Sequence, residues 1–177
     1  TGNTYSGGTY LNDAAIDVMD DGVLGAVPAE PTVNIVAQGI SQIRAKNGKA
    51  QLTLHENRGI YIARDAVFSF AGDRGAYQVT TTVNGPVSGY GALISAEWAG
   101  GGKAGIVELN GDISAFHGIY FPMGILRIPD AAQISPRARI HFGEMDENDT
   151  GVGEGIIETS GVIDRRGGCE AGVGVWG

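Results

Sequence analysis

The chain has 177 residues, 42% of them hydrophobic, and a net charge of −8 at pH 7. This length is enough for one domain with a buried core, and the negative charge disfavours nucleic-acid binding, which depends on clustered lysine and arginine. The 30 glycines stand beside only 6 prolines, a composition that argues against collagen and disorder and indicates a chain that turns often.

Three further features bound the class of protein. No apolar run reaches the length of a transmembrane helix, and the chain does not open with a signal peptide. The first residue is not Met, so we expect a mature, processed protein or a segment of a longer one. The single cysteine, Cys169, has no internal disulfide partner, and we expect it to be a small apolar core residue.

The first 28 residues contain two apolar runs of strand length, Thr9–Leu11 and Ala14–Val18. Both runs are bounded by the glycine, asparagine and aspartate residues that favour turns. Strands this short have open edges that the next turn of the same chain must cover, which is how a solenoid is built. The opening segment therefore predicts stacked strands that repeat along the chain.

Strand-sized runs continue beyond the opening segment, with starts about eight to ten residues apart, which is typical of all-β proteins. Three strands per turn give turns of roughly 25 to 30 residues and about six turns in all. We expect an all-β chain. The runs in the first half are Thr32–Val36, Ile40–Ala45, Ala50–Leu54, Gly59–Ala63, Ala66–Phe70 and Ala76–Val83.

A longer pattern covers Asn3–Gly25. It begins with Asn-Thr-Tyr-Ser-Gly-Gly-Thr, continues with an apolar strand and ends with Asp-Gly-Val-Leu-Gly. This pattern resembles the autotransporter-associated β-strand repeat. In that family a strand closed by Ser-Gly-x-Gly precedes the Asn-Thr-Tyr unit, and Ser88–Leu93 fits this closing pattern. The resemblance implies a right-handed parallel β-helix of the kind found in large secreted or surface-anchored bacterial proteins, and hence an extracellular or cell-surface location.

The main alternative fold is an antiparallel β-sandwich, because Asn-Gly pairs at 47–48, 84–85 and 110–111 are hairpin signals. The β-helix is preferred since its corners use the same residues and since residues 118–128 repeat the residue classes of 8–18. We therefore expect one β-helix domain over 1–177, either alone or as one repeat unit of a longer array or filament.

Residues at the centres of the strand-sized runs are expected to point inward and form the core. This set contains Tyr10, Ile16, Val18, Ile60, Ile62, Phe68, Phe70, Leu93, Ile106, Leu109, Ile125, Leu126 and Ile128.

One acidic segment imitates a calcium-binding loop. Asp146, Asn148 and Thr150 occupy alternate positions, and Glu154 follows shortly after, which is similar to a loop of oxygen ligands. The bidentate carboxylate expected at the twelfth position of such a loop is missing. A solvated acidic loop is therefore the main reading, with no cofactor, and calcium is the alternative.

A polysaccharide-cleaving β-helix needs carboxylates gathered on one face. Charged residues in predicted turns are the candidates, but each has an oppositely charged neighbour, which indicates surface ion pairs. These candidates are Arg64-Asp65, Asp73-Arg74 and Asp164-Arg165-Arg166. The three histidines lack metal-ligand spacing, and the two tryptophans fit either packing or a sugar platform: His55, His117, His141, Trp98 and Trp176.

The function expected from these patterns is a non-enzymatic extracellular structural or adhesive module that holds a rigid surface away from the cell. Its partners would be surface glycans or further copies of itself. The alternative is a carbohydrate-binding or carbohydrate-cleaving β-helix protein.

The two ends of the chain match each other as halves of one unit. Ala171–Gly177 followed by Thr1–Gly8 aligns without a gap with Ala104–Gly118. Neither end carries an evident polar cap, which a lone solenoid normally needs. We expect another copy to fill this junction, as a tandem repeat or by head-to-tail stacking, unless the chain is a fragment of a long β-helix. The expected interface residues are Val173, Val175, Trp176, Thr4 and Tyr5.

Overall fold

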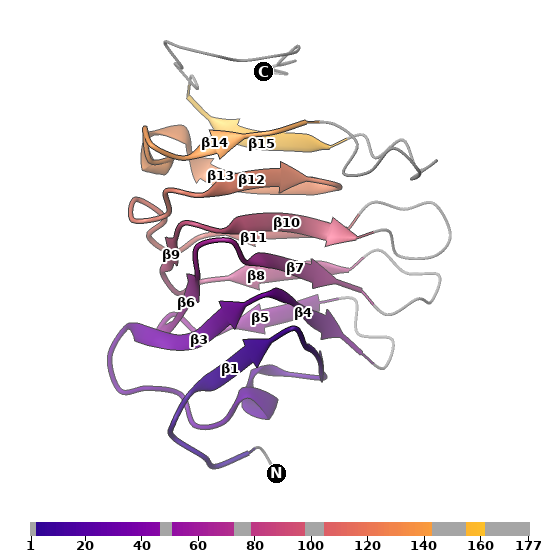
Figure 1. Ribbon diagram of the computed structural model, residues 1–177, viewed down its shortest axis with the longest axis vertical. Helices are drawn as coiled ribbons and strands as arrows, with labels where there is room; N and C mark the ends of the chain where they lie inside the picture. Colours follow the sequence, from indigo (N-terminus) through magenta and orange to yellow (C-terminus); the bar gives the residue numbers. More distant parts are fainter. Residues whose placement is uncertain (1–2, 47–50, 73–78, 98–104, 143–154, 162–177) are drawn as a thin grey trace.

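The computed structural model is a parallel β-solenoid (Figure 1). Its turns stack along one axis, and their strands form three parallel sheets that run along this axis. All strand pairings in the described part of the chain are parallel, so the alternative of an antiparallel sandwich is wrong. The model describes residues 3–46, 51–72, 79–97, 105–142 and 155–161.

Each sheet takes one strand from successive turns. Sheet A contains β1 (Thr9–Asn12), β3 (Thr32–Gln38), β6 (Arg58–Ile62) and β9 (Val87–Gly89). Sheet B contains β2 (Ala15–Val18), β4 (Ile40–Ala45), β7 (Val67–Ala71), β10 (Ala92–Glu97), β12 (Ile119–Pro122) and β14 (Arg139–Ile140). Sheet C contains β5 (Gln51–Leu54), β8 (Thr80–Val83), β11 (Ile106–Leu109), β13 (Ile125–Asp130) and β15 (Ile156–Ser160).

The length of a turn agrees with the sequence-based expectation. Three pairs of side chains that bond between neighbouring turns are 26 or 27 residues apart along the chain: Gln42 and Ser69, Thr82 and Glu108, and Asn84 and Asn110. The number of turns does not agree, since the solenoid has about four turns rather than six. The reason is that strands are missing from some levels: sheet A has four strands and only sheet B has six.

Irregular segments replace strands at both ends of the described solenoid. At the first level, the 3-10 helix η1 (Asp21–Leu24) follows β2 and packs against β5. Near the other end, Phe116 forms a single parallel bridge to Gly89, and η2 (Ala131–Gln133) follows β13. No helix in the described part of the chain is long and apolar enough to cross a membrane.

The core is a column of apolar side chains enclosed by the three sheets. Two aromatic pairs lie in it, Phe68 with Phe70 and Phe116 with Tyr120, with ring centroids 5.0 and 4.7 Å apart. Ten of the residues expected in the core are buried: Val18, Ile60, Ile62, Phe68, Phe70, Leu93, Ile106, Leu109, Leu126 and Ile128.

Two core expectations are wrong. Tyr10 is 74% exposed, because the alternation in β1 directs its neighbours Thr9 and Leu11 inward. Ile125 is only half-buried and lies on the outward side of β13, because its neighbour Leu126 faces inward. Ile16 is partly buried, but it packs against the core on the same face of β2 as Val18, as expected. A strand that is one residue out of phase exchanges its two faces, and short runs of three or four residues leave this phase poorly defined.

The expected second copy of the opening unit is also wrong. Tyr10 lies in sheet A whereas Tyr120 lies in sheet B, and Ile16 lies in sheet B whereas Leu126 lies in sheet C. Small and apolar residues alternate in the strands of all three sheets, so this pattern does not specify which sheet a strand joins.

Gly89 ends β9 at a corner where the backbone passes close to the preceding turn. Its φ is 114°, and a Cβ added there would overlap the carbonyl group of Ile62. Gly89→Ala is therefore expected to destabilise the fold by about 1–3 kcal/mol, measured by urea unfolding. Gly7→Ala is the matched control, because a Cβ at Gly7 meets nothing within 4 Å. Equal stability of the two variants would contradict the tight corner.

Candidate functional site

The outward face of sheet C carries a row of polar side chains that runs along the solenoid axis. The strand register places five residues side by side, one from each strand of sheet C: Thr53, Thr82, Glu108, Arg127 and Glu158. We call these five residues the sheet C ladder. They face outward because they alternate with buried residues along their strands.

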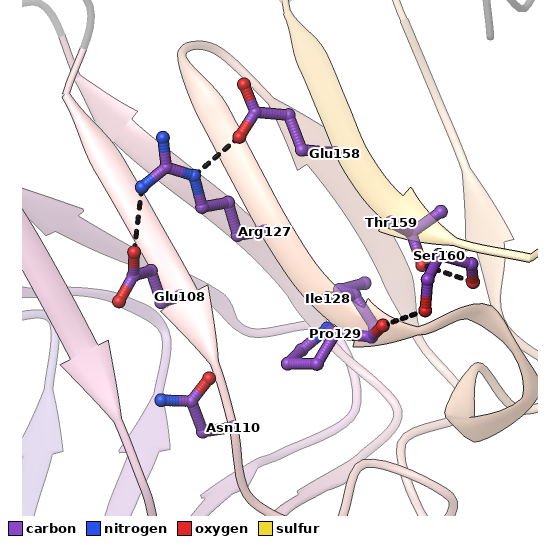
Figure 2. Close-up of a pocket in the computed structure, with 8 residues that line it drawn as sticks. All are labelled: Glu108, Asn110, Arg127, Ile128, Pro129, Glu158, Thr159 and Ser160. Atoms are coloured by element: carbon purple, nitrogen blue, oxygen red, sulfur yellow. Dashed lines mark hydrogen bonds and ion pairs between the residues drawn. The ribbon is translucent and has the colours of Figure 1, made fainter. Parts of the chain in front are cut away.

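Arg127 links the two carboxylates of the ladder (Figure 2). Its Nη1 donates to Glu108 Oε1 at 2.8 Å, and its Nε donates to Glu158 Oε2. The other oxygen of Glu108 accepts a hydrogen bond from Thr82 Oγ1 at 3.1 Å. The bonds to Glu158 and then to Glu108 raise the pKa of Arg127. The two carboxylates and one guanidinium leave a net charge of −1 on this part of the ladder.

These ion pairs lie at the surface, because the side chains are between a quarter and a half exposed. Pairs of this kind contribute about 0–1 kcal/mol each. The ladder therefore contributes little to folding, and its side chains are available at the surface.

Two hollows lie at the ends of the sheet C strands, next to the ladder. One has a volume of about 320 Å³ and is lined by Glu108, Asn110, Arg127, Ile128, Pro129, Glu158, Thr159 and Ser160 (Figure 2). The other has a volume of about 310 Å³ and is lined by Asp21, Thr53, His55, Glu56 and Asn84.

Two asparagines connect the hollows. Asn110 Nδ2 donates to Asn84 Oδ1 at 3.2 Å, and each asparagine lines one of the two hollows. The two hollows are therefore neighbours at the ends of the sheet C strands. We call this pair of hollows the sheet C groove. Sequence reasoning missed it because its residues come from five separate strands and their following turns.

A buried arginine organises the other notable polar cluster. Arg58 is the first residue of β6 and is fully buried. Its Nε and Nη2 donate to the two carboxylate oxygens of Asp21 at 2.8 and 3.0 Å. It also donates to the carbonyls of Leu24 and Gly25, both at 3.1 Å, and to Asn34 Oδ1. Arg58 thus ties η1 to the first turns of the solenoid.

At the N-terminal end of the described chain, η1 covers the core beside β5, whereas β1 and β2 are the end strands of sheets A and B. η1 packs beside β5, and Leu24 is fully buried. Of the expected interface residues, Thr4 is exposed and Tyr5 is 39% exposed. Tyr5 also accepts a backbone hydrogen bond from Ala26 at 2.8 Å. Val173, Val175 and Trp176 lie outside the described residues.

The expected calcium ligands Asp146, Asn148, Thr150 and Glu154 also lie outside the described residues. Within the described ranges, no group of three or more His, Cys, Asp or Glu side chains is placed to hold a metal ion. Other residues singled out from the sequence that lie outside these ranges are Asp73, Arg74, Trp98, Asp164, Arg165, Arg166 and Cys169.

Arg64 and His117 belong to a stack at the corner between sheets A and B. The guanidinium carbon of Arg64 lies 4.9 Å from the ring centroid of Tyr90, and the rings of Tyr90 and His117 are 5.6 Å apart. His117 Nδ1 and Ser135 Oγ are 2.7 Å apart. The ion pairs of the described residues do not join Arg64 to Asp65, so that expected pair is wrong.

The remaining histidines lie apart from this corner. The backbone N–H of His55 donates to Asp21 Oδ1 at 3.2 Å, and the side chain lines the sheet C groove. The ring centroid of His141 is 4.7 Å from that of Phe121 on sheet B. The three histidines therefore lie in three separate parts of the structure.

Asp112 makes the stability of the fold depend on pH. Its carboxylate accepts a hydrogen bond from the Ser114 backbone N–H at 2.9 Å, and this bond, followed by one to the Ser114 side chain, lowers the pKa of Asp112 below 3.8. Because the folded pKa lies below the unfolded one, the stabilisation is present above the unfolded pKa and is lost as pH falls through the folded pKa.

Between pH 5 and pH 2, the wild type is therefore expected to lose slightly more unfolding free energy than Asp112→Asn. The difference is small because Asp112 is exposed. Urea unfolding at a series of pH values measures it. Identical pH profiles for the two proteins would contradict the assigned role of the Ser114 bonds.

Comparisons with known proteins add no relative. No family model, no curated protein and no solved structure matches the chain. The parallel solenoid is consistent with a β-helix repeat protein, and the resemblance to the autotransporter-associated repeat rests on the residues of Asn3–Gly25.

Proposed function

We propose that this chain is a non-enzymatic structural and adhesive module that works outside the cell. The observation that carries the proposal is the continuous stack of parallel strands, four to six in each sheet, with a row of polar side chains on its outward face. Each inner strand is bonded on both edges, so the sheets form a stiff support. The resemblance of Asn3–Gly25 to a repeat of secreted and surface-anchored bacterial proteins favours an extracellular location.

The charge arrangement on sheet C supports a surface role over an acid–base reaction. General acid–base catalysis needs a carboxyl group that exchanges a proton with a bound substrate. Glu108 and Glu158 instead share one arginine, and Glu108 also accepts from Thr82. Such fixed pairs suit a surface that contacts a partner without changing it.

An adhesion assay tests this proposal. Beads coated with the folded chain should be retained under flow on bacterial or host cell surfaces more strongly than beads coated with an unrelated acidic protein. Heat-unfolded chain on matched beads should lose this retention. Retention no greater than that of the unrelated protein would contradict the adhesive role.

A polysaccharide screen tests the enzymatic alternative. The chain is expected to release no new reducing ends from a panel of neutral and acidic polysaccharides. Turnover that disappears in Asp65→Asn or Asp73→Asn would overturn the non-enzymatic assignment and favour a carbohydrate-cleaving protein.

End-to-end assembly is a second part of the proposal. It is supported by the gapless match of 171–177 and 1–8 to 104–118, and by the exposure of Tyr5 and Tyr10 near the N-terminal end. Tyr10 belongs to β1, which is the end strand of sheet A. Light scattering over a range of concentrations should show growing assemblies that Trp176→Ala reduces. A chain that stays monomeric at all concentrations would contradict end-to-end assembly.

Calcium remains a separate proposal for Asp146, Asn148, Thr150 and Glu154, whose alternating oxygen ligands support it. Calcium binding there should raise the melting temperature, and a chelator should reverse the rise. An unchanged melting temperature, with Asp146→Asn as the matched variant, would leave the module without a cofactor.

A further inference from the structure

The sheet C groove has the length of an extended polymer segment. Neighbouring strands of a sheet are about 4.8 Å apart, so the four steps from Thr53 to Glu158 span about 19 Å along the axis. Ladder residues line both hollows, and the Asn84–Asn110 hydrogen bond joins the lining of one hollow to that of the other. A chain laid along the groove would meet a new set of side chains at every turn.

The lining offers both hydrogen-bond donors and hydrogen-bond acceptors. Asn84 and Asn110 supply amides that both donate and accept, and Thr53 and Ser160 supply hydroxyls. Glu158 has one carboxylate oxygen bonded by Arg127, and its second oxygen can accept from a ligand. Hydroxyl groups of a sugar also both donate and accept, so they complement this lining.

Two other polymer classes fit the groove poorly. An anionic chain would meet four carboxylates in the lining but only one guanidinium, that of Arg127; the carboxylates are those of Asp21, Glu56, Glu108 and Glu158. A peptide that adds to a sheet needs a free strand edge. The inner strands β8, β11 and β13 are bonded on both edges and offer none there.

We propose that the sheet C groove binds a neutral, hydroxyl-rich oligosaccharide laid along the solenoid axis. This inference rests on the proposed adhesive function and names the ligand class and the surface for it. Asn84 and Asn110 join the linings of the two hollows and bridge the ligand across the middle of the groove.

Calorimetric titration with neutral hexasaccharides tests the inference. The probes are gluco-, manno-, galacto- and N-acetylglucosamine-based hexamers, with a heparin hexasaccharide as the anionic comparison. At least one neutral hexamer should bind, and Asn110→Ala should weaken that binding by about ten-fold, equivalent to about 1.4 kcal/mol. Asn110 is exposed and its side chain bonds only that of Asn84 in the described contacts, so the variant should fold normally.

Gln38→Ala is the matched control, because Gln38 is an exposed amide at the end of β3 on sheet A, away from the groove. It should bind like the wild type. The inference is overturned if no neutral hexamer binds, if Asn110→Ala binds as well as the wild type, or if heparin binds more tightly. Retention of coated beads without hexamer binding would overturn this inference alone, whereas loss of retention would overturn the adhesive function.

Discussion

Arg58→Leu is expected to reduce the unfolding free energy by about 3–5 kcal/mol. The substitution removes a fully buried guanidinium and takes its donors from the Asn34 amide oxygen, two carbonyls and the Asp21 carboxylate, which among the described contacts keeps only the bond from the His55 backbone N–H. Unpaired buried polar groups carry the full cost of desolvation. Urea unfolding followed by circular dichroism measures the loss.

Arg44→Leu is the matched control for this prediction. Arg44 Nε lies 2.7 Å from Asp17 Oδ1, but the two side chains are 38% and 45% exposed. This substitution should change stability by less than about 1 kcal/mol. A loss of less than about 1 kcal/mol in Arg58→Leu as well would show that Arg58 does not hold η1 in place.

Leu126→Ala is expected to cost about 2–5 kcal/mol, since Leu126 is fully buried and its truncation leaves a cavity in the core. Its neighbour Ile125 faces outward from β13 and is only half-buried, so Ile125→Ala should cost clearly less. Thermal and urea unfolding of both variants give the comparison. A change of less than about half a kcal/mol in Leu126→Ala would mean that the faces of β13 are assigned the wrong way round.

The all-β solenoid could be predicted because its signal is local. Strand-length runs bounded by turn residues recur along the chain, and the predicted run Ile40–Ala45 has the same bounds as β4. The Asn-Gly pairs were harder to interpret. Asn84-Gly85 and Asn110-Gly111 do not close hairpins; each follows a strand of sheet C at a corner of the solenoid.

Those corners explain why hairpin signals occur in a parallel fold. A Cβ added at Gly111 would overlap the carbonyl of Gly85 in the preceding turn, so the stacked turns require glycine where they approach most closely. A hairpin and a solenoid corner thus favour the same dipeptide for different reasons. The sequence pattern alone left both folds open.

The polar clusters could not be predicted, because their members are far apart in the chain. Arg58 is 37 residues from Asp21, and Arg127 is 19 residues from Glu108 and 31 from Glu158. Sequence reasoning paired charges with their immediate neighbours, as for Arg64 and Asp65. In a solenoid the nearest neighbour in space belongs to the next turn, and for Arg64 it includes the ring of Tyr90.

The account depends most on the parallel register that aligns the sheet C ladder, and a disulfide tests that register directly. Thr53 and Thr82 are paired Cα partners in β5 and β8, so cysteines there would lie about 4.8 Å apart, within the range that a disulfide bridges. In a Cys169→Ser background, Thr53→Cys/Thr82→Cys should cross-link on mild oxidation and remain folded. Thr53→Cys/Thr80→Cys, two residues out of register at about 8 Å, should not. Preferential cross-linking of the shifted pair would contradict the parallel solenoid, and so would the absence of cross-linking in both pairs.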